Sequence, residues 1–265
     1  MAQKTANSDQ LTFWDHLDQL RGSIIRILAV VMVLGFAAFF FKEQLFTVLL
    51  APKHHSFITY RLFERITGAS IGEFSVNMIN TGLAQQFMIH LKAAFAVGLL
   101  LASPYILHMI YSFVSPALYR SERRVAVRLV GGGYLMFMLG VALSYFVIFP
   151  LTFRFLGTYQ VSGDVPNFIS LESYMSTLFL LCIVMGVMFE LPVASWVLAR
   201  MGFVGVDFMR RYRRHAIVAI LVVAAVITPT ADAFTLCVVS LPIYLLYEFG
   251  ILLAVRAEKK RLRTE

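Results

Sequence analysis

The sequence predicts an all-α integral membrane protein with six membrane-crossing helices and both ends in the cytoplasm. Of its 265 residues, 59% are hydrophobic and only 14% are charged, whereas soluble domains carry about 45–50% apolar and about 25% charged residues. The apolar residues are gathered into runs that approach the roughly 20 residues a helix needs to cross hydrocarbon. We therefore expect a single membrane domain over residues 1–265.

Six apolar runs make up the predicted spans: 24–41, 87–111, 125–149, 174–198, 216–229 and 233–255. The fifth has an uncharged core of about 14 residues, so it covers roughly 21 Å of a hydrocarbon core that is ~30 Å thick. A buried core helix, a re-entrant segment and a short span that thins the bilayer all fit this length. Charge favours the short span, because the arginines at 210–214 and the basic tail at 256–265 then fall on one side.

The distribution of basic residues also orients the chain. With six spans, 17 of the 23 lysines and arginines lie on one side of the membrane and 6 on the other. Loops rich in lysine and arginine stay in the cytoplasm, so both termini and the loops after the second and fourth runs are expected there. The net charge of +8 then reflects topology and attraction to anionic lipid, and no nucleic-acid partner is expected.

Two segments outside the spans are expected to have structure of their own. The segment 12–23 predicts an amphipathic helix, with an apolar stripe beginning at Phe13, that lies along the cytoplasmic face before turning into the first span. The segment 42–86 is expected to form an extracytoplasmic cap. Within it, apolar residues at helical spacing predict a surface helix over 57–66.

Two carboxylates stand inside predicted spans, where a charge costs about 2.5–3.5 kcal/mol on insertion scales and usually faces a polar cavity or a partner. Glu190 is either a structural hydrogen-bonding group or part of a functional polar patch in a concave site, and Pro192 favours a kink in its helix. Glu248 lies near a helix end, where an ion pair within the fold is sufficient. Asp232 is placed to cap the start of the sixth run.

A further carboxylate, Glu122, lies in a short loop next to Arg123 and Arg124 that is expected in the cytoplasm. A surface ion pair is the ordinary interpretation. The loop is apolar for an exposed turn, however, and Phe113 stands at its start. A partly desolvated carboxylate there would suit bidentate capture of a guanidinium group.

No catalytic residue, metal site or cofactor is expected. A G-x-S-x-G match at 68–72 lacks the preceding strand and the partner residues of a nucleophile elbow, so an intramembrane hydrolase using Ser70 is a distant alternative. The histidines form no metal-binding pattern, and Cys182 and Cys237 lie inside apolar runs. The glycines at 131–133 suit close helix packing.

A series of motifs carries a resemblance to a known family: 16–21 (HLDQLR), 102–104, 113–123 (FVSPALYRSER), 145–151 (YFVIFPL), 189–192 (FELP), 227–232 (ITPTAD) and 241–248. Each is weak alone, but their order and placement are specific. The chain resembles TatC, the multispanning component of the twin-arginine protein translocase, from about residue 13 to residue 255. The resemblance implies a glove-shaped six-helix bundle in the bacterial inner membrane that binds twin-arginine signal peptides. It also implies single-span TatA- and TatB-type partners, self-association, and dependence on the proton-motive force.

The resemblance further implies a signal-peptide site. In the family, an acidic residue in the amino-terminal motif and one in the first cytoplasmic loop bind the paired arginines, and the loop position is Glu122 here. The amino-terminal position holds Gln19, which accepts a hydrogen bond without charge. Asp18 beside it points about 100° away on an ideal helix and substitutes only if the helix rotates. Arg21 and Phe113 complete the expected site.

Three further positions follow from the resemblance. The family's membrane glutamate corresponds to Glu190 and its first-loop proline to Pro52, and Asp232 belongs to a turn one residue longer than the usual T-P-P-D. The first extracytoplasmic loop is also longer than in compact members. The main rival function is a proton-coupled secondary transporter that uses Glu190 and Glu248, although the halves of the chain lack the matched broken helices of inverted-repeat transporters.

Overall fold

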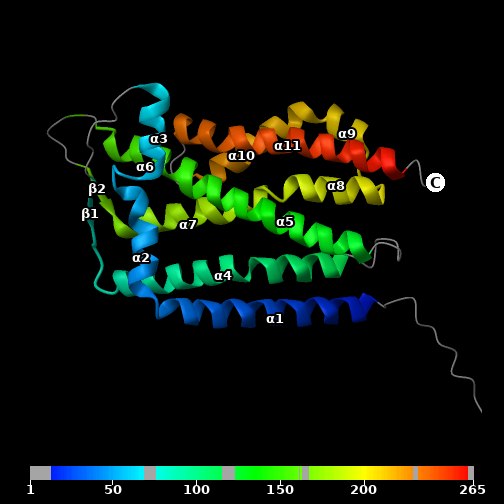
Figure 1. The fold of residues 1–265 in the computed structure, drawn as a ribbon, viewed down its shortest axis with the longest axis horizontal. Helices are drawn as coiled ribbons and strands as arrows, with labels where there is room; N and C mark the ends of the chain where they lie inside the picture. The colour runs from blue at the N-terminus through cyan, green and yellow to red at the C-terminus, as the bar shows by residue number, and fades with distance from the viewer. Residues whose placement is uncertain are drawn as a thin grey trace, which may run out of the picture.

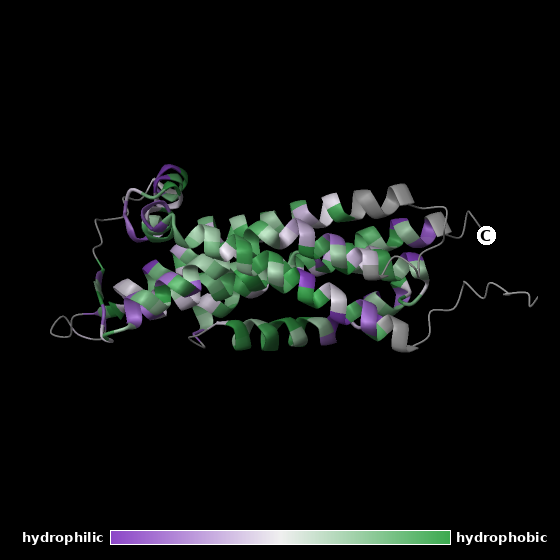
Figure 2. Cartoon of the chain, turned by 90° about the horizontal axis from the view of Figure 1, so that it is seen from below, coloured by the Kyte–Doolittle hydropathy of each residue, from purple (hydrophilic) through white to green (hydrophobic). Residues whose placement is uncertain are grey.

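A computed structural model describes residues 13–68, 76–114, 123–160, 162, 167–228 and 232–261. In this part of the chain, long helices lie side by side and two crosswise helices cover one end (Figure 1). Hydrophobic residues fill the middle of the bundle, while hydrophilic residues gather toward its two ends (Figure 2). This banding is what a bilayer demands of a protein that crosses it.

The elements are, in chain order, α1 (Phe13–Phe39), α2 (Lys42–Leu50), the 3₁₀ turn η1 (Ala51–Lys53), α3 (Ile58–Thr67), β1 (Asn77–Ile79), α4 (Gln85–Val114), α5 (Arg123–Leu143), the π-helical segment η4 (Ser144–Ile148), α6 (Phe149–Thr158), β2 (Phe168–Ser170), α7 (Leu171–Met188), α8 (Leu191–Met201), α9 (Val206–Arg211), α10 (Arg213–Ile227) and α11 (Ala233–Arg261).

Five helical segments in the described part of the chain are long and apolar enough to cross a membrane: Leu17–Phe39, Gln85–Ser112, Val130–Thr158, Leu171–Met201 and Ala233–Lys259. They coincide with the first four predicted runs and the sixth. The fifth run forms α10, which has 15 residues and is therefore about 22 Å long. It packs against α11. The count of six spans and their orientation stay predictions.

One prediction about the amino-terminal segment is wrong. No turn separates it from the first span, because α1 runs without interruption from Phe13 to Phe39. The segment holds no proline, and the Ser23 hydroxyl donates to the Gln19 carbonyl over 2.9 Å, a bond compatible with continued helix. The polar residues before 23 therefore extend the axis of the first span.

The contact between α1 and α4 is made backbone to backbone at Gly35 and Gly98. A Cβ atom built on Gly98 would lie 2.5 Å from the Gly35 nitrogen and 2.9 Å from the Val31 carbonyl oxygen. Only a residue without a side chain fits there. Small residues at such crossings let membrane helices approach closely enough for van der Waals attraction to hold them together.

Helix α2 runs crosswise over one end of the long helices (Figure 1). Two of its last carbonyl groups accept hydrogen bonds from tyrosines of the bundle, in addition to the bond that the Ala51 amide donates to the Val48 carbonyl. The Tyr145 hydroxyl donates to the Val48 carbonyl over 2.6 Å, and the Tyr174 hydroxyl donates to the Leu49 carbonyl over 3.0 Å. These bonds attach the crosswise helix to both η4 and α7.

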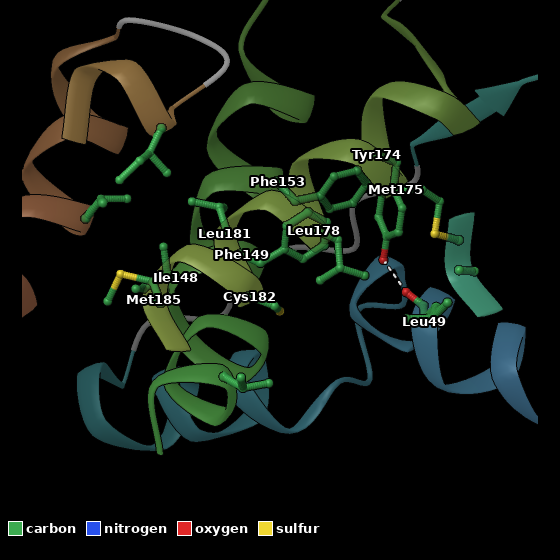
Figure 3. Close-up of a cluster of buried hydrophobic side chains, with 14 of the residues drawn as sticks. Leu49, Ile148, Phe149, Phe153, Tyr174, Met175, Leu178, Leu181, Cys182 and Met185 are labelled. Atoms are coloured by element: carbon green, nitrogen blue, oxygen red, sulfur yellow. Dashed lines mark hydrogen bonds between the residues drawn. The ribbon is translucent and has the colours of Figure 1, made fainter. Parts of the chain in front are cut away.

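The bundle's core begins directly beneath this attachment. Tyr174 packs edge-on against the rings of Phe149 and Phe153, with centroid distances of 4.9 and 5.0 Å. Leu178 and Leu181, further along α7, are almost completely buried. Figure 3 shows these side chains together with the hydrogen bond from Tyr174 to Leu49. The cap therefore rests on the buried core of the bundle.

Helix α3 is anchored to a defect in the third long helix. Pro150 has no amide hydrogen to give the Phe146 carbonyl four residues earlier, and Phe146 lies within the π-helical segment η4. The Thr59 hydroxyl of α3 donates a hydrogen bond to that Phe146 carbonyl. A carbonyl left without its helical partner is thus used to hold the cap.

Buried Tyr60 makes the second attachment of α3. Its hydroxyl lies 3.1 Å from both the Pro52 and the Pro150 carbonyl oxygens, and its side chain is 2% exposed. Burial raises the pKa of Tyr60 well above its ordinary value, so the hydroxyl keeps its proton and remains a donor. Pro52 itself is buried in η1.

We expect Tyr60→Phe to destabilise the protein by about 1–2 kcal/mol, because two buried carbonyl groups lose their shared donor. That corresponds to a fall of roughly 2–8 °C in the melting temperature for a chain of this size. The matched control is Tyr159→Phe, since Tyr159 is 65% exposed. Thermal unfolding of the detergent-solubilised variants measures the difference, and equal melting temperatures would contradict the bonding described for Tyr60.

A two-stranded sheet ties the two longer loops at this end together. Strands β1 and β2 pair in parallel, with Asn77 opposite Phe168 and Ile79 opposite Ser170. Next to them, the Lys92 ammonium group lies 2.9 Å from a Glu172 carboxylate oxygen. The two strands have only three residues each and were not predicted from the sequence.

Candidate functional site

Glu190 stands at a break in the fourth long segment. Helix α7 ends at Met188, α8 begins at Leu191, and Glu190 is the residue just before α8. The break follows from Pro192, which cannot donate a backbone hydrogen bond to the preceding turn. The predicted kink is thereby confirmed, and it turns the carboxylate toward α4 and α5.

Among the described residues, one oxygen of the Glu190 carboxylate has a hydrogen-bond donor and the other has none. The Tyr111 hydroxyl of α4 donates to Oε2 over 3.0 Å. The other oxygen, Oε1, is buried and has no hydrogen-bond partner among the described residues. A buried polar atom without a partner costs free energy, so this oxygen needs an explanation.

Gly133 of α5 makes room for this pair. A Cβ atom at this position would lie 3.0 Å from Glu190 Oε2 and 3.1 Å from the Tyr111 hydroxyl. By contrast, Cβ atoms at Gly131 and Gly132 would meet nothing within 4 Å. Of the three consecutive glycines, only Gly133 is therefore required by a close approach within the described residues.

A cavity of about 460 Å³ opens beside the carboxylate, between α4, α5, α7 and α8. Apart from Glu190, Tyr111 and Ser103, its walls are apolar: Leu99, Ile106, Leu107, Ile110, Phe137, Ile183, Val187, Ala194, Val197 and Leu198. An apolar chamber with one orienting polar group is a usual form for a ligand site. It can take an apolar segment that offers one hydrogen-bond donor to the carboxylate.

The predicted signal-peptide residues that the structure describes lie at the end of the bundle opposite the cap (Figure 1). Asp18, Gln19 and Arg21 are exposed on the first turns of α1, and Phe113 belongs to the last turn of α4. Glu122 lies outside the described residues, and its chain neighbour Arg123 begins α5. Figure 1 places the start of α1, the end of α4 and the start of α5 at this same end.

The remaining predicted residues have clear structural partners. Oδ1 of Asp232 accepts a hydrogen bond from the Thr235 amide over 2.7 Å, so Asp232 caps the start of α11. Glu248 accepts a hydrogen bond from the Arg213 guanidinium group of α10 over 2.8 Å. Since Glu248 is held in an ion pair, it offers little support for a proton carrier.

Two contributors to the Glu190 site were missed from the sequence. Tyr111 was assigned only to the end of the second run, and Gly133 was treated as one of three equivalent packing residues. A polar aromatic side chain in the terminal turn of a span was the available signal for Tyr111. No local pattern separates Gly133 from its neighbours, because the difference lies in which other helix it faces.

Fold and site together define a multi-pass membrane protein that presents one carboxylate to an apolar cavity. No group of three or more potential metal ligands exists among the residues whose structure is described.

The family model "Sec-independent protein translocase protein (TatC)" matches residues 15–242, and the chain belongs to this family. It is accordingly a translocase component of the bacterial inner membrane and not an enzyme.

Individual relatives agree with this assignment. The TatC protein of Escherichia coli K12 is 33% identical over 241 residues, which cover 89% of this chain and 85% of the relative. The TatC protein of Azotobacter chroococcum is 32% identical over 91% of this chain and 88% of its own length. A crystal structure described as "Twin Arginine Translocase Receptor- TatC" superposes with a TM-score of 0.74 at 30% identity, covering 91% of this chain and 99% of that one.

Proposed function

We propose that this protein is the signal-peptide receptor of a twin-arginine translocase, which binds paired arginines at its cytoplasmic end and takes the apolar stretch of the peptide toward Glu190. The observation that carries the proposal is the arrangement of α1 and α4. These helices are antiparallel (Figure 1) and touch at Gly35 and Gly98. Gln19 is 16 residues before Gly35, and Val114 is 16 residues after Gly98. Both therefore lie about 24 Å from the helix crossing, toward the same end of the bundle.

The chemistry of the proposed site suits guanidinium groups. Asp18 and Gln19 offer exposed oxygen acceptors on α1, and Glu122 is covalently bonded to the first residue of α5. Arginine donates paired hydrogen bonds to a carboxylate in a geometry that lysine cannot copy. Glu122 is the principal arginine acceptor in this proposal, with Gln19 or Asp18 as the second and Arg21 and Phe113 alongside.

The cavity next to Glu190 supports the second half of the proposal. It lies between the later part of α4 and α8, which is the half of the bundle facing the proposed arginine site. An apolar peptide segment anchored by its arginines would reach the cavity by continuing along α4. The free Oε1 of Glu190 would accept a hydrogen bond from it or from a partner helix.

Assembly with single-span TatA- and TatB-type subunits, and self-association, belong to the same proposal. The family membership supports a complex with other translocase subunits. The topology we propose, with six spans and both termini in the cytoplasm, rests on the distribution of lysine and arginine. It keeps the receptor end on the side where signal peptides are made.

The proposal is tested by measuring the affinity of a twin-arginine signal peptide for the solubilised protein and for its Glu122→Ala variant. Loss of a charge-assisted pair is worth about 1.5–3 kcal/mol, so we expect binding to weaken roughly 10- to 100-fold. A twin-lysine peptide should bind the wild type weakly and lose little in the variant. The control is Asp207→Ala, an exposed carboxylate on α9. Equal affinity of the twin-arginine peptide for wild type and Glu122→Ala would remove Glu122 from this role.

A further inference from the structure

Helix α3 of the cap exposes an apolar strip made of Ile58, Leu62 and Ile66. These side chains are 63%, 56% and 75% exposed and, being four residues apart, share one face of the helix. Arg61 and Arg65 are also exposed. On an ideal helix they project about 60° and about 20° from Ile58, so the two arginines border the strip along one side.

The strip cannot turn inward, because the other side of α3 is fixed to the bundle. Thr59 and Tyr60 donate hydrogen bonds to the carbonyls of Phe146 and Pro150. Phe57, just before the helix, stacks on the Phe146 ring with a centroid distance of 5.9 Å. The orientation of α3 is therefore set by Tyr60, on the side opposite the strip, and by Thr59, on the flank of the strip away from the arginines.

The attachment point also sets the level of α3 relative to a membrane. Phe146 is three residues before the end of the apolar run 125–149 and 21 residues beyond its start, which is about 32 Å along a helix. A hydrocarbon core is ~30 Å thick, so Phe146 lies near its far boundary. Helix α3 runs crosswise to the long helices and stands out from the side of the bundle (Figures 1 and 2). Phe146 and Val147, which are also exposed, continue the apolar surface below it.

We propose that α3 is an interfacial helix that places its strip in the hydrocarbon boundary on the cap side of the membrane and binds phospholipid through Arg61 and Arg65. A helix with an apolar face and flanking basic residues lies in this way in the plane of a bilayer. Guanidinium groups pair with phosphate through two parallel hydrogen bonds. Two features favour lipid over a protein partner. The strip lies at the level of the lipid headgroups, and positively charged arginines border it. The binding is selective for anionic lipid.

The position of the strip is tested with a spin label at Ile66→Cys in a Cys237→Ser background, after reconstitution into phosphatidylcholine–phosphatidylglycerol bilayers. We expect the label to collide more with oxygen, which dissolves in hydrocarbon, than with a water-soluble nickel chelate. The matched control is Leu83→Cys, another apolar position at the cap end, which is fully exposed but lies off α3; its label should favour the nickel chelate. The proposal is overturned if the Ile66→Cys label behaves like the control, or if Ile66→Cys forms a disulfide between two copies of the chain.

The role of the arginines is tested by the binding of fluorescent phosphatidylglycerol and phosphatidylcholine to the detergent-solubilised protein. One basic residue at a membrane surface gives about a fivefold preference for anionic lipid, so the Arg61→Gln/Arg65→Gln variant should lose more than tenfold of that preference. The control variant Lys42→Gln/Lys53→Gln removes the same amount of positive charge from the cap, but outside α3. It should keep the wild-type preference for phosphatidylglycerol. Equal losses in both variants would overturn the proposal. Neither measurement depends on peptide binding or export, so failure here leaves the proposed receptor function untouched.

Discussion

Gly98→Val is expected to be strongly destabilising, and it acts at the contact between α1 and α4. Even the Cβ atom of alanine would approach the Gly35 nitrogen to 2.5 Å, and the atoms it meets belong to backbone. No change of side-chain rotamer relieves such a contact, so α1 must move away from α4. Overpacking of this kind costs about 3 kcal/mol or more, which corresponds to a fall of roughly 10 °C in melting temperature.

The matched control for this prediction is Gly131→Val. That substitution adds the same atoms to a neighbouring helix, at a position where a Cβ atom meets nothing within 4 Å. Thermal unfolding of both variants in the same detergent separates the steric effect from the lower flexibility of valine. A melting temperature for Gly98→Val within a degree or two of the control would show that α1 and α4 are not in backbone contact.

Glu190→Leu is expected to have the largest effect on transport while leaving the fold intact. Leucine matches the apolar walls of the cavity and removes a buried oxygen that has no partner among the described residues, whereas the Tyr111 hydroxyl loses its acceptor. These two effects oppose each other, so stability should change little. The proposed acceptor for an incoming donor is lost, however. Because a hydrogen bond to a charged group is worth about 1.5–3 kcal/mol, export of a folded reporter behind a twin-arginine signal should fall at least tenfold.

Several variants separate this effect from a general loss of charge. Glu190→Gln keeps an acceptor and should export more than Glu190→Leu. Tyr111→Phe removes the hydroxyl that donates to Oε2 of Glu190. Its export should lie between that of Glu190→Gln and that of the wild type. Glu248→Gln breaks the ion pair with Arg213 and should leave export within about twofold if Glu248 only stabilises α10 against α11. Wild-type export by Glu190→Leu would rule out the proposed contact, and a severe defect in Glu248→Gln would revive the transporter alternative.

The long helices were predictable because hydrocarbon imposes a strong local requirement on sequence. Runs of apolar residues such as 87–111 can only be satisfied inside a membrane or a large core, and α4 covers that run completely. The same logic marked Glu190 and Pro192 as exceptions, and the structure places a helix break and a cavity at these residues. The surface helix predicted over 57–66 also corresponds to α3.

What the sequence could not supply is the pairing of distant residues. Tyr111 and Glu190 are 79 positions apart, and nothing near either one identifies the other. The three-residue strands β1 and β2 are too short for an alternating pattern, and they exist because the loops meet across the cap. The expected turn before the first span failed for the opposite reason, since a local amphipathic pattern does not say whether the axis bends.

The tyrosine bonds to α2 have a mechanical consequence. They tie the ends of η4 and α7 to one crosswise helix, whereas the cavity lies toward the opposite end of α4 and α8. Widening of the cavity is therefore expected to pivot about the end that α2 ties together, with α4 and α8 separating at the opposite end. The end at which the helices can separate is therefore the end that carries the proposed signal-peptide site.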